Sequence, residues 1–201
     1  MSWRERAADA FDLLFRMFPH AGPPGLRRIG DPGPDSPVLL TGNYALTLRR
    51  LTRALRGRDA WLLAADSHGI NVWCAAGGGH LTDHEVIAVL RSSGIGDRVR
   101  HRRLVLPQLC ATGVERRRVS ERTGWQCVWG PARLEDLPAF LDRGEHVRKG
   151  ERRMRFPLRE RFEMATVWAV PVTVVVAALL WLLVDAQLAA VAAATVLAAI
   201  V

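Results

Sequence analysis

The sequence predicts an α/β fold in which a Rossmann-like, doubly wound parallel sheet is followed by a transmembrane α-helix. Short apolar segments of strand length alternate with amphipathic helical segments between residues 37 and 141, which is typical of a parallel sheet covered by helices. Residues 164–184 carry no charge and are long enough to cross a hydrocarbon core of about 30 Å. The 201 residues, 49% of them hydrophobic, suffice for one soluble core and a membrane segment.

The N-terminal segment, residues 1–24, opens with an amphipathic stretch that ends at Phe18. Charged residues interrupt its apolar run, so it is a poor signal peptide. Residues 22–37 are rich in Gly and Pro, which indicates a loop. Residues 37–41 then predict a short buried strand.

A helix is expected next, because apolar residues at 44, 48, 51 and 55 share one helical face and arginines lie opposite. A second strand is predicted over residues 61–65. The following helix begins at Thr82, where Thr82 and Glu85 form a capping-box pattern, and it ends near Gly94. Two further strands and a short helix complete the domain, over residues 104–106, 126–129 and 134–141.

In such sheets, ligands bind beyond the carboxyl ends of the strands. The residues expected at that edge follow the predicted strands directly. They are Thr41, Gly42, Asn43, Asp66, Ser67, Pro107, Gln108, Gly130 and Pro131.

The positive charge comes almost wholly from arginine. The formal net charge is +8, and Lys149 is the only lysine. The arginine pairs and triplets are scattered over several predicted elements without interleaved aromatic residues. This pattern favours solvated helix faces and argues against a nucleic-acid partner.

Residues 164–184 are predicted as a first transmembrane helix, in which Pro171 is tolerable. In the preceding basic linker, residues 147–163, cations outnumber acidic residues. The positive-inside rule therefore predicts the inner (plasma) membrane, with the preceding domain on the cytoplasmic side. Residues 188–201 form an apolar run too short to span. We interpret this run as the start of a second transmembrane helix in a truncated membrane domain.

The three cysteines, Cys74, Cys110 and Cys127, show no C-x-x-C spacing. This argues against a disulfide framework, a zinc knuckle and a bound iron–sulfur cluster. Cys74 lies alone between an apolar run and three glycines. It is a buried core residue, a nucleophile or a single soft metal ligand. Cys110 and Cys127 are expected to be structural.

Two other patterns suggest a metal site and a nucleotide loop, and we favour neither. His80 and His84 have the spacing of a zinc pair on one helix face, but the Thr82 cap leaves His80 outside the helix. Residues 77–79 are three glycines before a helix and could hold a phosphate. A G-x-G-x-x-G pattern and a Walker lysine are absent from the sequence, so a nucleotide loop is a weak interpretation.

Several stretches together carry a resemblance to a known family. The most specific is Gly69-Ile70-Asn71-Val72-Trp73-Cys74-Ala75-Ala76-Gly77. The chain resembles the corrinoid-binding domain of the mercury-methylating corrinoid proteins, which are themselves similar to the large subunit of the corrinoid iron–sulfur protein of acetyl-CoA synthesis. The supporting stretches are Gly25-Leu26, Ile29-Gly30, Ser36 to Tyr44, Leu106-Pro107-Gln108-Leu109, Gly113-Val114, Gly130-Pro131, Glu135 to Pro138 and Phe140-Leu141.

The resemblance implies that residues 25–146 form a corrinoid-binding domain that holds a base-off, cobalamin-type corrinoid. It also implies that Cys74 is the catalytic residue and the lower axial ligand to cobalt. A thiolate is a strong, soft donor that pushes electron density toward the trans position. The expected cofactor contacts are Thr41, Asn43, Asp66, Asn71, Val72, Trp73, Ala75, Ala76, Gly77, Pro107, Gln108, Gly130 and Pro131.

The implied activity is that of a membrane-anchored, corrinoid-dependent methyltransferase that transfers a methyl group to Hg(II). The implied partners are a ferredoxin-like electron donor with 4Fe–4S clusters and a methyl-folate or methyl-donor protein. Gly78 stands where the family motif has lysine, which is a loss of charge. The alternative is therefore a corrinoid-binding methyl carrier that does not methylate mercury. A third alternative is a membrane-tethered Rossmann-like domain without a cofactor.

Overall fold

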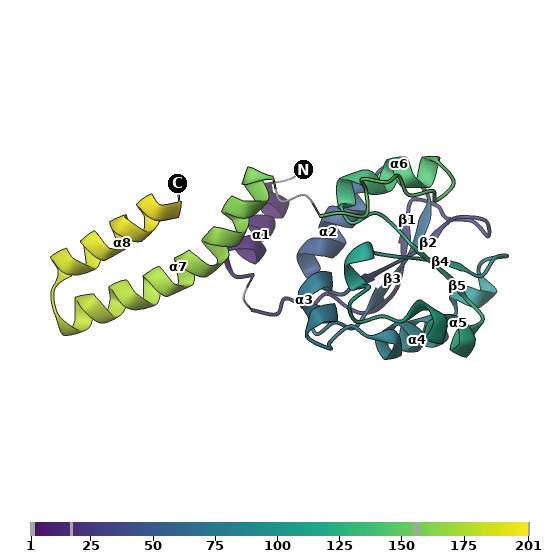
Figure 1. Cartoon of the computed structure of the whole chain (residues 1–201), viewed down its shortest axis with the longest axis horizontal. Helices are drawn as coiled ribbons and strands as arrows, with labels where there is room; N and C mark the ends of the chain where they lie inside the picture. The colour runs from purple at the N-terminus through teal and green to yellow at the C-terminus, as the bar shows by residue number, and fades with distance from the viewer. Residues whose placement is uncertain (1–2, 17, 155–156, 201) are drawn as a thin grey trace. The chain divides into compact units, whose positions relative to one another are not determined.

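The computed structural model describes residues 3–16, 18–154 and 157–200 (Figure 1). They form two compact units, one of residues 19–154 and one of the segments on either side. Parts of the predicted N-terminal segment, basic linker and second transmembrane helix lie outside the described residues, at positions 1, 2, 17, 155, 156 and 201.

A five-stranded sheet forms the centre of the larger unit, in the order β1-β3-β2-β4-β5. The strands β2, β3, β4 and β5 run parallel, whereas β1 pairs antiparallel with β3. The prediction of an α/β fold is confirmed, but the prediction of an entirely parallel sheet is wrong, because the edge strand β1 is reversed. The strands are β1 (Gly25–Ile29), β2 (Val38–Gly42), β3 (Ala60–Ala65), β4 (Arg103–Leu106) and β5 (Gln126–Trp129).

Helices cover both faces of this sheet (Figure 1). One apolar cluster joins the sheet to α2 (Ala45–Ala54) and α6 (Leu137–Asp142), the latter preceded by the 3-10 turn η3 (Leu134–Asp136). The other cluster joins the opposite face to three helices and to the short turns beside them. These are α3 (Val72–Gly77), α4 (Asp83–Ser92), α5 (Arg116–Thr123), η1 (Ile95–Asp97) and η2 (Gln108–Cys110).

Strands β2 and β3 are buried along their whole length. Their side chains alternate between the two clusters, because successive residues of a strand point to opposite faces. Leu62 packs with α2 and α6, whereas Leu63 packs with α3 and α4. A continuous apolar run in the sequence is therefore what a central strand of this three-layer fold requires.

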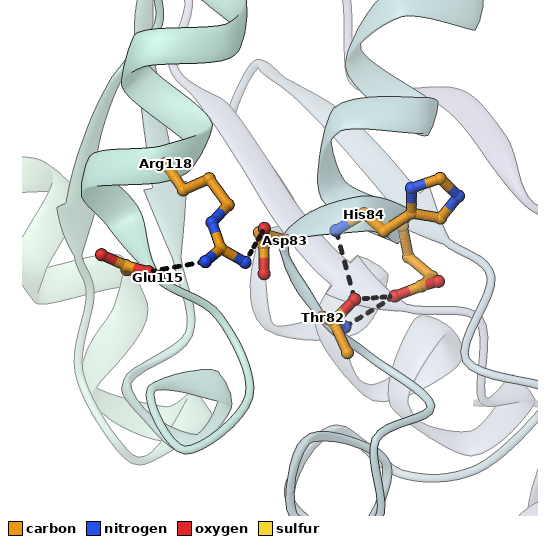
Figure 2. Close-up of polar contacts among 6 residues, drawn as sticks. Thr82, Asp83, His84, Glu115 and Arg118 are labelled. Atoms are coloured by element: carbon orange, nitrogen blue, oxygen red, sulfur yellow. Dashed lines mark hydrogen bonds and ion pairs between the residues drawn. The ribbon is translucent and has the colours of Figure 1, made fainter.

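The predicted capping box at the start of α4 is confirmed (Figure 2). The Thr82 N–H donates to Glu85 Oε2 at 2.7 Å, and the His84 N–H donates to Thr82 Oγ1 at 3.2 Å. Partial burial alone would raise the pKa of Glu85, but the hydrogen bonds from Thr82 outweigh it and the pKa is lowered. Arg118 of α5 lies 3.2 Å from Asp83 and thereby links the two helices.

The smaller unit is helical. It contains α1 (Trp3–Leu14), α7 (Leu158–Leu183) and α8 (Ala186–Ile200), and α8 folds back along α7 (Figure 1). Among the described residues, Met164–Leu183 is the one helical stretch whose length and composition suit a membrane crossing. Most of its large apolar side chains are exposed, including Trp168 and Trp181.

Three elements of the larger unit were not predicted from the sequence. The strand β1 lies within the Gly- and Pro-rich segment, which suggested a loop. It is at the edge of the sheet and only partly buried, so its sequence needs no long apolar run. The helix α5 buries only Val119 and therefore shows no helical periodicity. The helix α3 has six residues, too few for a periodic signal.

Candidate functional site

The chain reverses its winding direction at β2. From β2 it passes to β3 on one side, and from β3 it crosses to β4 on the other side of β2. The segments that follow β2 and β4 therefore lead to opposite faces of the sheet. Open α/β sheets bind ligands at such a switch point, beyond the carboxyl ends of the strands. The segments at this point are residues 43–44 and 107–110.

Asn43 connects three chain segments at this edge. Its side-chain oxygen accepts hydrogen bonds from the N–H groups of Ser67 and Gly69, at 2.9 and 3.0 Å. Its side-chain nitrogen donates to the Gly22 carbonyl and to Asp66 Oδ1, both at 3.1 Å. Asn43 is only 2% exposed, so this amide holds the loop after β3 and the segment before β1 against the end of β2.

Ser67 completes the network, although it was not among the predicted contact residues. Its Oγ accepts from the Asn43 N–H at 3.1 Å. The same oxygen lies 3.0 Å from Asn43 Oδ1 and 2.8 Å from the Ile70 carbonyl, one of which receives its single proton. A Cβ on Gly42 would lie 2.5 Å from Ser67 Oγ. The close approach of β2 to this loop therefore requires glycine at position 42.

The helix α3 presents two side chains to the outside of the domain. It begins after Asn71, whose side chain accepts a hydrogen bond from the Cys74 N–H at 3.1 Å and caps the helix. Trp73 is 46% exposed and the Cys74 thiol is free and exposed. On the inner side, the three residues Val72, Ala75 and Ala76 are buried in the core.

The turn η2 packs closely against α3. A Cβ on Gly113, three residues after η2, would lie 2.5 Å from the Ala76 carbonyl and 2.6 Å from the Leu81 carbonyl, so glycine allows the segment after η2 to approach the end of α3. Gln108 begins η2. Its Oε1 is buried without a hydrogen-bond partner among the described residues.

The structure brings all the predicted contact residues to the carboxyl edge of the sheet, but their side chains differ in exposure. Asp66, Trp73, Cys74 and Gly77 are exposed, and Asn71, Pro107 and Gln108 are half-buried. The buried ones are Thr41, Asn43, Val72, Ala75, Ala76, Gly130 and Pro131. Asp66, Trp73 and Cys74 are thus the predicted residues with exposed, chemically useful side chains, whereas the Gln108 Oε1 is an acceptor that is buried in the empty protein.

The other two cysteines are buried, as predicted. Burial raises the pKa of the Cys110 thiol to about 12, and the Cys110 Sγ donates to the Pro107 carbonyl at 3.1 Å. Burial also raises the pKa of the Cys127 thiol to about 11. Both thiols therefore stay protonated at neutral pH.

The two histidines with zinc-like spacing have different neighbours in the structure. His80 lies edge-on to His68, with ring centroids 5.3 Å apart, whereas His84 lines a cleft of about 360 Å³ beside the end of β3. His68, Asp66 and Glu85 also line this cleft. Over the described ranges, no group of three or more His, Cys, Asp or Glu residues could hold a metal ion.

Comparisons with known proteins identify the family. A family model of the CO dehydrogenase/acetyl-CoA synthase delta subunit matches residues 17–141, more than half of the chain. The chain belongs to this family. Residues in this region are 38% identical over 122 residues to the acetyl-CoA decarbonylase/synthase complex subunit gamma of Methanopyrus kandleri. The corresponding subunits of Archaeoglobus fulgidus and Methanocaldococcus jannaschii are each 35% identical, over 122 and 125 residues.

The chain spans about a quarter of the length of these relatives, namely 26%, 26% and 25%, and the aligned region covers 60%, 60% and 61% of this chain. These matches overturn the assignment to the mercury-methylating proteins, and with it the predicted methyltransferase activity on Hg(II). The stretches that suggested that assignment lie within or at the end of the matched region. The second relationship from the sequence, to the large subunit used in acetyl-CoA synthesis, agrees with the match.

We expect Cys74 to be the one rapidly reacting thiol of the folded chain. A disulfide reagent such as DTNB at pH 8 should modify one thiol quickly in the native protein and all three after denaturation, because reactivity requires an accessible thiolate. The Cys74→Ala variant should lose the fast phase. Rapid modification of two or more native thiols would contradict the burial of Cys110 and Cys127.

Proposed function

We propose that residues 19–154 form a corrinoid-binding methyl-carrier module. The observation that carries this proposal is an exposed thiol, Cys74, beside η2 at the switch point of a domain that belongs to the acetyl-CoA synthase subunit family. The relatives are named as subunits of an acetyl-CoA decarbonylase/synthase complex. By analogy, the partners we propose are other subunits of a complex of that kind.

The residues present fit a corrinoid in three respects. The Cys74 thiol offers a soft donor suited to cobalt, and the Trp73 indole on the same helix offers an exposed apolar surface to a flat macrocycle. The orphaned Gln108 Oε1 offers an acceptor to the amide groups at the rim of such a ring. When bound, the corrinoid supplies a cobalt ion that carries a methyl group.

Each part of the site then has a defined task. Asn71 fixes the first turn of α3 through its bond to the Cys74 N–H, and so sets where the thiol lies. Asn43 and Ser67 hold the loop that leads into α3. We propose that the Cys74 sulfur, as a thiolate, is the lower ligand of a base-off corrinoid. A ferredoxin-like protein with 4Fe–4S clusters and a methyl-folate-type donor remain the proposed sources of electrons and of the methyl group.

The Cys74→Ala variant tests the ligand assignment. Wild type and variant loaded with the same corrinoid should differ in visible absorption, because a cobalt–thiolate bond changes the electronic transitions of the ring. Cys127→Ala, which removes a buried thiol, is the matched control and should keep the wild-type spectrum. Identical spectra for wild type and Cys74→Ala would remove Cys74 as a ligand without affecting corrinoid binding itself.

We further propose that α7 crosses the cytoplasmic membrane with the larger unit on the cytoplasmic side. The names of the relatives give no support for a membrane location, so this proposal depends on the apolar stretch Met164–Leu183 and on the exposed cations before it. These cations are Arg148, Lys149, Arg152 and Arg153, and they follow the positive-inside rule.

Sealed inverted membrane vesicles test this topology. Protease added outside them should digest residues 19–154, because the cytoplasmic face is then turned outward. Protection in inverted vesicles, together with digestion in spheroplasts, would refute the orientation. Recovery of the full chain in the soluble fraction would refute the membrane location itself.

A further inference from the structure

Gln108 carries a buried acceptor that the protein itself leaves unused. Its Oε1 is shielded from solvent and receives no hydrogen bond from the described residues. In the described part of the chain, three other buried side-chain atoms lack a hydrogen bond, but each belongs to a charged group with another contact. Arg27 Nη2 donates to the Pro23 carbonyl, Arg133 Nε lies 3.5 Å from Glu135, and Glu145 Oε2 lies 2.6 Å from Arg103.

The turn that holds Gln108 is stable without this oxygen. The Cys110 N–H donates to the Pro107 carbonyl at 3.1 Å, and the Val114 N–H donates to the Cys110 carbonyl at 2.9 Å. The Cys110 side chain is fully buried and fixes the turn in the core. Gln108 is thus held at the switch point by its neighbours, and its side-chain oxygen contributes nothing to that placement.

An orphaned buried acceptor costs free energy in the empty protein, and a ligand that brings a donor recovers it. Gln108 begins the turn that packs on α3, the helix that carries Cys74. The ligand proposed for that helix has primary amides around its rim. A primary amide can donate an N–H to the Gln108 oxygen as it stands. An ionised carboxylate at the same place is an acceptor only, so it would require the Gln108 amide to turn over and would bury a charge.

We propose that Gln108 Oε1 accepts a hydrogen bond from a rim amide of the corrinoid and selects amidated corrinoids over those with carboxylates there. The inference depends on the proposed function and names the chemical class of its ligand. It makes Gln108 a specificity-determining residue. The apoprotein should lose nothing when this oxygen is removed, since no described group donates to it.

Binding of two corrinoids to the full chain tests the proposal. The probes are cobinamide, whose rim carries amides, and cobyrinic acid, whose rim carries carboxylates. The measured quantity is the ratio of their dissociation constants in wild type, Gln108→Leu and Gln126→Leu. Gln126 is an exposed residue at the amino-terminal end of β5, away from the carboxyl ends of the strands where the proposed site lies. Gln126→Leu is therefore the matched control. The basic chain attracts an acidic corrinoid equally in all three proteins, so this attraction does not change the ratio from one protein to the next.

We expect the preference for cobinamide to fall about tenfold in Gln108→Leu and to stay unchanged in Gln126→Leu, as the loss of one hydrogen bond in a buried site predicts. The melting temperature of the empty Gln108→Leu protein should equal or exceed that of wild type. An unchanged ratio in Gln108→Leu overturns the inference while leaving corrinoid binding in place. Failure of wild type to bind either corrinoid overturns the proposed function and this inference together.

Discussion

The side chain of Asn43 is the interaction on which the candidate site depends. One amide joins the end of β2, the loop after β3 and the segment before β1. Its oxygen accepts from the Ser67 and Gly69 N–H groups in buried surroundings, and leaving either of these donors unsatisfied would cost about 1–3 kcal/mol. The loop that it fixes leads directly into α3, and so the position of Cys74 follows from the position of Asn43.

Glycine and small residues extend this constraint from the loop to the neighbouring turn. Gly42 lets β2 approach Ser67, and Gly113 lets the segment after η2 approach the end of α3. These contacts leave no room for a Cβ, so the exposed thiol of Cys74 and the turn that begins at Gln108 are held by tightly packed neighbours. The site therefore consists of a few accessible side chains on a scaffold whose own polar groups are largely satisfied.

Much of this arrangement could be predicted from the sequence. The apolar runs of β2 and β3 and the Thr82–Glu85 capping box follow simple physical rules, and the structure confirms them. The reversed edge strand β1 could not be predicted, since an edge strand with one neighbour needs no apolar run. Asn43 and Gln108 were predicted to follow strands, and they lie just beyond the carboxyl ends of β2 and β4. Their burial and the direction of their side-chain amides depend on contacts between distant segments, which the sequence does not reveal. Asn71 is a residue type that commonly caps helices, and it could have indicated the start of α3.

The proposed corrinoid site lies at the switch point between β2 and β4. Amide hydrogen exchange of the full chain, with and without one equivalent of cobinamide, shows whether a corrinoid binds there. We expect slower exchange in residues 71–77 and 107–113 and unchanged exchange in residues 124–126, at the amino-terminal end of β5. Protection confined to the cleft beside α4, or no protection at all under saturating cobinamide, would contradict it.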